Sequence, residues 1–224
     1  MVIPVFNGER FVGEAIESCL AQTLAPAEVI VVDDGSTDAS AKVAESFGPP
    51  VHLIRMPHRG ASEARNTGVA RSSGELIAFL DADDLMKPDR LERQVAAIEQ
   101  PPGAEFVLGR GQAQMVGGAE APEAVAARLA PIAEGSPEYL AMSLLTTRDA
   151  FDRVGPFEPG LRFGEDGDWI MRAFEMGLPH ALLDEPLIVR RFHGGNVTSD
   201  SEGARRGNFE ILKRRAARHR ARAT

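Results

Sequence analysis

The sequence has little cysteine and no long apolar run. Cys19 is the only cysteine among 224 residues, so no disulfide forms within the chain. No apolar segment approaches the roughly 20 residues that span a bilayer, and the N-terminus lacks the basic start and apolar core of a signal peptide. We therefore expect a cytoplasmic protein in which Cys19, spaced on an apolar helical face, is buried rather than reactive.

The sequence also lacks a surplus of basic residues over most of its length. Its 33 acidic residues outnumber the 25 Arg and Lys, for a net charge of −8. From Arg190 onward, however, ten Arg and Lys face only three acids, so the remaining body is strongly acidic. An acidic body argues against nucleic acid as a partner. With 43% hydrophobic and 26% charged residues, the composition is that of a soluble globular domain.

Four apolar runs of strand length alternate with helix-prone segments in the first hundred residues. They cover residues 2–5, 28–33, 51–55 and 75–80. This alternation predicts a parallel, doubly wound α/β sheet. Because crossovers between such strands are almost always right-handed, all four carboxyl ends should lie at one edge of the sheet, where ligands bind.

Carboxylates directly follow two of these strands. Asp33 and Asp34 end the second run, and Asp81, Asp83 and Asp84 follow the fourth. Unpaired carboxylates are too costly to bury in a core, and oxygen ligands gathered at one edge suit a divalent cation that carries phosphates. The sequence therefore predicts a metal-assisted phosphate site in preference to a solvated turn.

Two basic features accompany these acids. Arg65 falls in the first turns of the helix after the third run, at the same edge of the sheet. The tail, from 204 to 222, is predicted to be a basic helix. A solvated surface helix is one interpretation of the tail. The other is weak docking on an anionic membrane by charge, since its apolar stripe is thin.

The second half of the chain has a weaker pattern. A helix is predicted from Glu165 and Asp166 onward, with Trp169 in the core. Three acids within four residues at this helix start exceed what the helix dipole needs, so we infer a second functional cluster. The other expected elements are short strands at 106–108, 112–116, 143–147, 181–184 and 187–192, a helix-prone stretch at 117–135 and a helical turn at 148–154.

Five motifs follow one another along the chain. They are Val2-Ile-Pro-Val-Phe-Asn7, Val31-Val-Asp-Asp-Gly-Ser-Thr-Asp38, Ala64-Arg-Asn-Thr-Gly68, Leu80-Asp-Ala-Asp-Asp84 and Gly164-Glu-Asp166. In their order and spacing the chain closely resembles the family 2 glycosyltransferases, from Met1 to about Ser199. The resemblance implies the GT-A fold, a three-layer α/β/α domain around a central, mainly parallel, Rossmann-like mixed sheet.

The resemblance also implies residues for a nucleotide-sugar donor. Pro4, Phe6 and Glu9 would flank its base and ribose. Asp34 would accept a hydrogen bond from the base, and Arg65 would lie near the nucleotide.

A metal and a general base are implied as well. Asp83 would coordinate Mn²⁺ or Mg²⁺ that bridges the diphosphate, Asp81 would contact the ribose or the metal shell, and His193 would supply a further metal or phosphate contact. Asp166, next to Glu165, matches the base that takes the proton of the attacking hydroxyl. One cation and one base suffice for direct displacement with inversion at the sugar.

We therefore expect a glycosyltransferase that moves a sugar from a nucleotide-diphosphate sugar, expected to be a UDP-sugar, to an undefined hydroxyl acceptor. One GT-A domain would comprise a nucleotide-binding half (1–100), an acceptor and catalytic-base half (101–199) and a basic C-terminal helix (200–224). The oligomeric state stays open, with a homodimer among the alternatives. The alternative function is a noncatalytic sugar-nucleotide-binding module. A dehydrogenase is disfavoured, because no Gly-x-Gly-x-x-Gly follows any strand.

Overall fold

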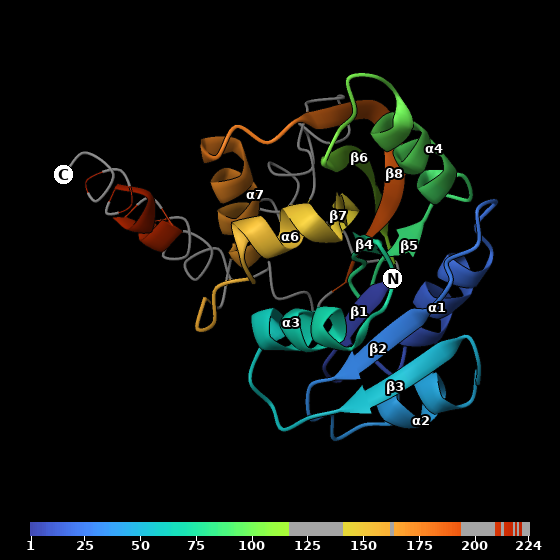
Figure 1. The fold of residues 1–224 in the computed structure, drawn as a ribbon. Helices are drawn as coiled ribbons and strands as arrows, with labels where there is room; N and C mark the ends of the chain where they lie inside the picture. Colours follow the sequence, from blue (N-terminus) through green and yellow to red (C-terminus); the bar gives the residue numbers. More distant parts are fainter. Residues whose placement is uncertain are drawn as a thin grey trace.

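The computed structural model describes residues 1–116, 141–161, 164–193, 209–211, 213–216, 218 and 220 (Figure 1). Its strands are β1 (Val2–Val5), β2 (Val29–Asp33), β3 (Val51–Arg55), β4 (Leu76–Ala78), β5 (Leu85–Met86), β6 (Phe106–Met115), β7 (Leu145–Thr147) and β8 (His180–Phe192). Its helices are α1 (Val12–Leu20), α2 (Ser40–Glu45), α3 (Ala61–Arg71), α4 (Arg90–Glu99), α6 (Arg148–Val154) and α7 (Glu165–Glu175), with a 3₁₀ turn at Ala141–Ser143.

The first three strands form a parallel sheet in the order β1-β2-β3. Val2 lies opposite Ile30 in the ladder, and Val29 lies opposite Val51. Every residue of β2 is buried, as expected for a continuous β-branched run covered on both faces. The predicted alternation of strands and helices is confirmed here.

A second sheet has the order β4-β7-β6-β8-β5. Only β6 and β8 are parallel in it, and its other pairs are antiparallel. One parallel bridge, between Val2 of β1 and Phe79, joins it to the first sheet, where the Leu80 N–H donates to the Val2 carbonyl at 3.2 Å. The fourth strand is therefore parallel to β1, as predicted, although its own ladder is an antiparallel one with β7.

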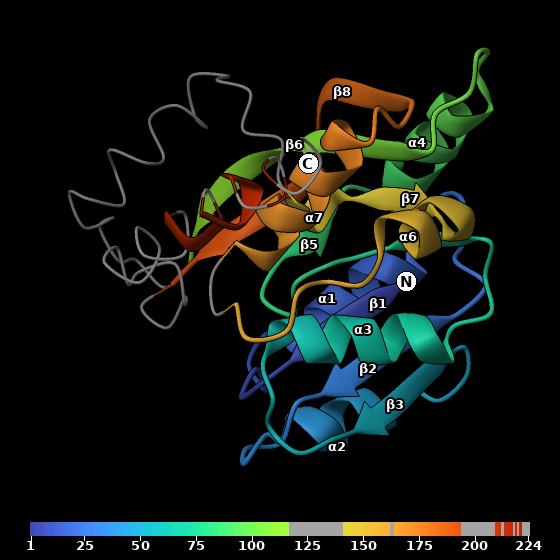
Figure 2. The same cartoon turned by 60° about the vertical axis from the view of Figure 1, so that its left-hand side comes forward.

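Helices cover both faces of the first sheet (Figure 2), and alternate residues of β1 and β2 accordingly pack in different core clusters. Ile3 and Val31 pack in one cluster with the apolar side of α1. Ile30 and Val32 pack on the other face, against Ala64 of α3. A further cluster, rich in aromatic residues, joins β4 and β6 to α6 and α7. The structure thus has the three-layer α/β/α arrangement of the expected fold class.

Two pairs of predicted strands are single strands in the structure. Residues 106–108 and 112–115 belong to β6, which ends one residue before the predicted Val116, and residues 181–184 and 187–192 belong to β8. Each pattern is interrupted by turn-like residues, Gly109-Arg110-Gly111 in one and Asp184-Glu185-Pro186 in the other. These interruptions lie opposite each other, and register shifts next to Arg110 carry both strands through them without a turn.

Other predictions are confirmed or lie outside the described residues. Trp169 and Cys19 are fully buried, and burial raises the pKa of the Cys19 thiol to about 11. The helix-prone stretch at 117–135 lies outside the described part of the chain, as do residues 204–208, 212, 217, 219, 221 and 222 of the predicted tail helix. Within that part, every helix is too short or too polar to cross a bilayer.

Candidate functional site

The loop after β1 and the loop after β2 form one hydrogen-bonded unit. Asn7 adopts a φ of 51°, a left-handed conformation that asparagine tolerates. Its backbone N–H donates to Ser36 Oγ at 2.9 Å, and its Oδ1 accepts from the Thr37 N–H at 2.8 Å. Glu9 Oε2 accepts from the Ala39 N–H at 2.8 Å. Ser36 and Thr37 therefore bind the β1 loop, and α2 begins only at Ser40.

Asp34 holds the loop that leads into α3. Its carboxylate is almost fully buried and accepts from the N–H groups of Arg59 and Gly60, both at 2.8 Å. His58 Nδ1 lies 2.9 Å from its Oδ2. Phe6, which is 48% exposed, stacks on His58 with ring centroids 4.1 Å apart. The contact of Asp34 with a nucleobase stays a prediction. Phe6, which stacks on the histidine that contacts Asp34, is a partly exposed aromatic ring on which a base could stack.

The turn after β4 gathers three carboxylates. Oxygens of Asp81, Asp83 and Asp84 lie within 4.8 Å of one another. Burial, and then the neighbouring negative charges, raise the pKa values of Asp83 and Asp84. Such crowded, partly desolvated oxygens fit a hard divalent cation, whose charge would offset their repulsion. The chemistry of this donor set therefore suits Mn²⁺ or Mg²⁺.

His193 directly follows β8 and lies next to this acidic turn. Its Nε2 lies 3.2 Å from Asp83 Oδ2. Its ring stacks on Phe11 with centroids 4.3 Å apart. The structure thus brings the predicted metal residues Asp81, Asp83 and His193 together, while their binding of a metal stays a prediction.

Arg191 is a residue of this region that the sequence reasoning missed. It is 3% exposed, its backbone N–H donates to Asp84 Oδ1 at 2.8 Å, and its guanidinium donates to the Asp83 carbonyl and to Glu14. The signal was present: Leu187, Val189 and Arg191 share one face of the strand, and an arginine in line with apolar residues requires buried acceptors. Arg191 therefore ties the acidic turn to α1.

Arg65 joins the acidic turn to the start of α7. Its Nη2 lies 2.7 Å from Asp81 Oδ1, and its Nη1 donates to Glu165 Oε1. The guanidinium is buried, which alone would lower its pKa, but Asp81, Glu165 and Asp166 together raise it above the ordinary value. Residues from the two halves of the chain therefore meet at the buried guanidinium of Arg65. The contact of Arg65 with a nucleotide stays a prediction.

Asp166 lies beside this ion-pair network in the first turn of α7. Burial raises its pKa to about 6, the negative charge of Glu165 adds to the rise, and Arg65 opposes it. Its Oδ1 accepts from the Gly167 N–H at 2.6 Å. A carboxyl with this pKa is mostly ionised at neutral pH yet more basic than an ordinary aspartate, which suits a proton acceptor.

The β1 loop lies between the Asp34 region and the acidic turn. A Cβ on Gly8 would lie 3.8 Å from the Cβ of Ala82, while the Gly8 N–H donates to Ser40 Oγ at 2.8 Å. Pro4, half-buried in β1, lies opposite Val32. The predicted donor residues therefore line adjoining loops at the carboxyl edge of the parallel sheet.

The fold and these loops define the class of the protein. A parallel Rossmann-like sheet joined to a mixed sheet is the architecture of the GT-A glycosyltransferases, to which its structural neighbours belong. The chain belongs to glycosyl transferase family 2, whose family model matches residues 1–152.

Individual relatives agree with this assignment. The chain is 29% identical over 215 residues to the uncharacterized glycosyltransferase EpsJ of Bacillus subtilis, covering 88% of this chain and 62% of that protein. S. aureus TarS in complex with UDP-GlcNAc has a TM-score of 0.69 at 21% identity, covering 89% of this chain and 60% of that one. Mannosyltransferase PcManGT from Pyrobaculum calidifontis, in complex with GDP-Man and Mn²⁺, has a TM-score of 0.63 at 21% identity, covering 88% and 58%. The chain thus spans about three fifths of the length of these proteins.

Proposed function

We propose that this glycosyltransferase moves a sugar from a UDP-sugar to an acceptor hydroxyl, with inversion at the anomeric carbon. The observation that carries the proposal is the Arg65 bridge, which brings the acidic turn and the Glu165–Asp166 pair to one place. Two structural neighbours support a nucleotide-sugar donor, since TarS was solved with UDP-GlcNAc and PcManGT with GDP-Man and Mn²⁺.

The donor would lie across the loops at the carboxyl edge of the parallel sheet. Phe6 would stack on the base, with Asp34, Glu9 and Pro4 around the base and ribose. Arg65 would hold Asp81 in place and lie near the nucleotide. Asp81, Asp83 and His193 would hold Mn²⁺ or Mg²⁺, which, when bound, supplies positive charge for the leaving diphosphate.

Asp166 would act as the general base. Its raised pKa lets it accept the proton of the acceptor hydroxyl as that oxygen attacks the sugar carbon. Glu165, whose carboxylate is engaged by Arg65, would act through its charge on Asp166 rather than by taking the proton itself.

The remaining expectations are proposals of the same kind. We propose one cytoplasmic GT-A domain with a nucleotide-binding half (1–100), a catalytic-base half (101–199) and a basic C-terminal helix. A homodimer is also a proposal. A weak contact of the tail with an anionic membrane is a further proposal. It would compete with ion pairs inside the molecule, since Arg214, Arg215 and Arg218 each contact an acidic side chain of the body.

The base assignment is tested by Asp166→Asn. We expect this variant to lose transfer while its affinity for UDP in Mn²⁺ stays within about twofold, because a neutral isostere keeps the shape of the site but removes the proton acceptor. Asp152→Asn, on the exposed side of α6, is the matched control and should transfer normally. Retained turnover by Asp166→Asn would exclude Asp166 as the base.

A wild-type chain that binds UDP-sugars but neither transfers nor hydrolyses them would favour the noncatalytic module.

A further inference from the structure

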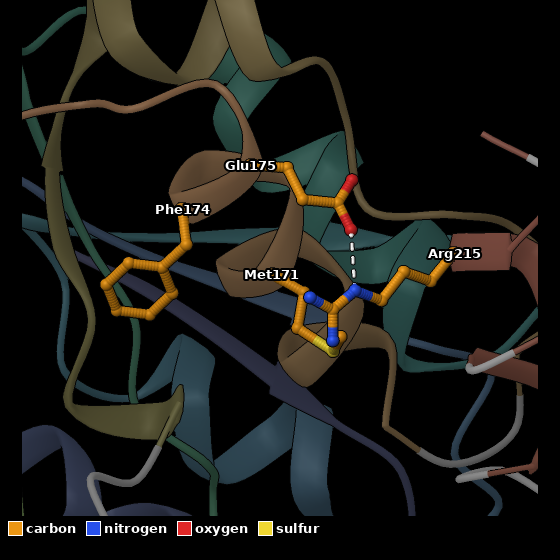
Figure 3. A pocket seen from close by; sticks show the side chains of 4 residues that line it. All are labelled: Met171, Phe174, Glu175 and Arg215. Atoms are coloured by element: carbon orange, nitrogen blue, oxygen red, sulfur yellow. Dashed lines mark ion pairs between the residues drawn. The ribbon is translucent and has the colours of Figure 1, made fainter. Parts of the chain in front are cut away.

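Three arginines of the C-terminal helix contact acidic groups on and beside α7. Arg218 Nη1 lies 2.9 Å from Asp168 Oδ1, and its Nε lies 3.3 Å from Glu175 Oε2. Arg215 Nε lies 3.2 Å from Glu175 Oε1, and Figure 3 shows this pair across a pocket whose other lining residues are Met171 and Phe174. Arg214 Nη1 reaches Glu158, in the loop before α7, at 2.7 Å.

These contacts differ from ordinary solvated ion pairs. The side chains of Asp168 and Glu175 are 3% and 7% exposed. Carboxylates buried to this degree are strongly destabilising without cationic partners. Ile211, on the same helix, is 5% exposed, so the helix also buries an apolar side chain. The tail is therefore packed on the body of the protein at this point, next to α7 (Figure 1).

Asp168 connects the tail with the first turn of α7. Its Oδ2 accepts from Arg172 Nε at 2.9 Å. Arg172 in turn donates to the carbonyls of Val154 and Pro156, at 2.6 and 2.8 Å, and so holds the segment that follows α6. Asp168 is two residues from Asp166. The N-cap residue, Gly164, offers no side-chain cap. The orientation of this turn therefore depends on Arg65 at Glu165 and on Arg172 and Arg218 at Asp168.

We propose that the basic C-terminal helix is an intramolecular clamp on the turn that carries the base. Arg218 is a positioning residue that acts through Asp168, and Arg215 reinforces it through Glu175. The effect on catalysis rests on the proposed role of Asp166. The clamp also gives a role to three of the basic residues of the tail, Arg214, Arg215 and Arg218, whose partners are acids of the same molecule.

The kinetic test compares Arg218→Gln, Arg218→Lys and the control Lys213→Gln in the full chain. Lys213 is on the same helix, is 68% exposed and pairs only weakly, at 3.8 Å, with Glu210 of that helix. We expect Arg218→Gln to lower kcat about tenfold, because small displacements of a catalytic group are costly, with the donor KM within twofold of wild type. Arg218→Lys should recover part of the loss, and Lys213→Gln should match wild type. An unchanged kcat in Arg218→Gln, or an equal loss in Lys213→Gln, would overturn the positioning role.

Amide hydrogen exchange tests the clamp without any enzymatic readout. In Arg218→Gln, residues 165–175 should exchange faster than in wild type, whereas α3 should keep its protection, since only the contacts of α7 are removed. Unchanged exchange in α7 would reject the clamp whatever the activity. Faster exchange in α7 of Arg218→Gln, together with a wild-type chain that transfers no sugar, would keep the clamp and reject the proposed function. An equal loss of protection in α3 would mean general destabilisation and would also reject the clamp.

Discussion

Arg65 is the residue on which the meeting of the two halves depends. It is buried between Asp81 and Glu165, so removing its charge would leave two carboxylates without their shared cation. We expect Arg65→Met to lower the free energy of unfolding by about 3 kcal/mol. Urea denaturation should show this loss, while Arg71→Met, at the exposed end of the same helix, should change little. Equal stability of the two variants would contradict a structural role for the bridge.

The raised pKa of Asp166 predicts the acid limb of the pH profile. The base is active when deprotonated, so kcat should fall as pH drops below about 6 and should level off above pH 7. Glu165→Gln removes a neighbouring negative charge and should move this limb to lower pH. A limb unmoved in Glu165→Gln would show that another group controls the profile.

The same shift has a consequence for stability. The folded chain binds the Asp166 proton more tightly than the unfolded chain, in which this carboxyl has the ordinary aspartate pKa of 3.8. This group therefore makes folding less favourable as pH rises from about 4 to about 6, which is the reverse of the behaviour of an ion-paired aspartate.

At the scale of elements, two helical glycines have opposite environments. A Cβ on Gly68 of α3 would lie 2.4 Å from Val2 Cγ1, whereas a Cβ on Gly167 of α7 would have no neighbour within 4 Å. We expect Gly68→Ala to destabilise the protein by roughly 2 kcal/mol through overpacking against β1. Gly167→Ala should stabilise it by up to about 1 kcal/mol through helix propensity. Thermal unfolding of both variants checks the pair, and a gain from Gly68→Ala would refute the close packing of α3.

The sequence was sufficient for elements whose signal is local. The strands at 2–5 and 28–33 have nearly continuous apolar runs, the strand at 51–55 has a weaker one, and the helix at Glu165 has clear periodicity, so the sequence places each within a few residues. The sequence predicts each of the long strands β6 and β8 as two short ones, because Gly109 and Pro186 resemble turn residues when each strand is considered alone. Only their mutual pairing, between segments about 75 residues apart, makes them continuous.

The candidate site was predictable to a similar extent. Five motifs located its carboxylates and Arg65. Their long-range partners were not visible in the sequence: that Arg65 binds Glu165, that Arg191 supports Asp84 and that Arg218 reaches Asp168 are contacts across 100, 107 and 50 residues. Patterns of residue type place a side chain on an element, whereas ion-pair partners depend on how the elements pack.

At the scale of the whole molecule, a metal site at the acidic turn would cost stability when it is empty. Asp83→Asn relieves repulsion among three crowded carboxylates, so without metal the variant should melt at or above the wild-type temperature. Adding Mn²⁺ with UDP should raise the melting temperature of wild type, because ligands that bind only the folded state stabilise it. It should raise that of Asp83→Asn much less, and EDTA should abolish the wild-type gain. Equal gains in both proteins would exclude Asp83 as a metal ligand.

Among the described residues, the bridge between Val2 and Phe79 is the one β-bridge that joins the two sheets, and it has a mechanical consequence. The two sheets share little hydrogen bonding across this seam, and the loops that would grip a sugar nucleotide come from both sides of it. A bound donor would therefore form a second connection between the two sheets. The donor-bound protein should resist relative movement of the sheets better than the protein without donor.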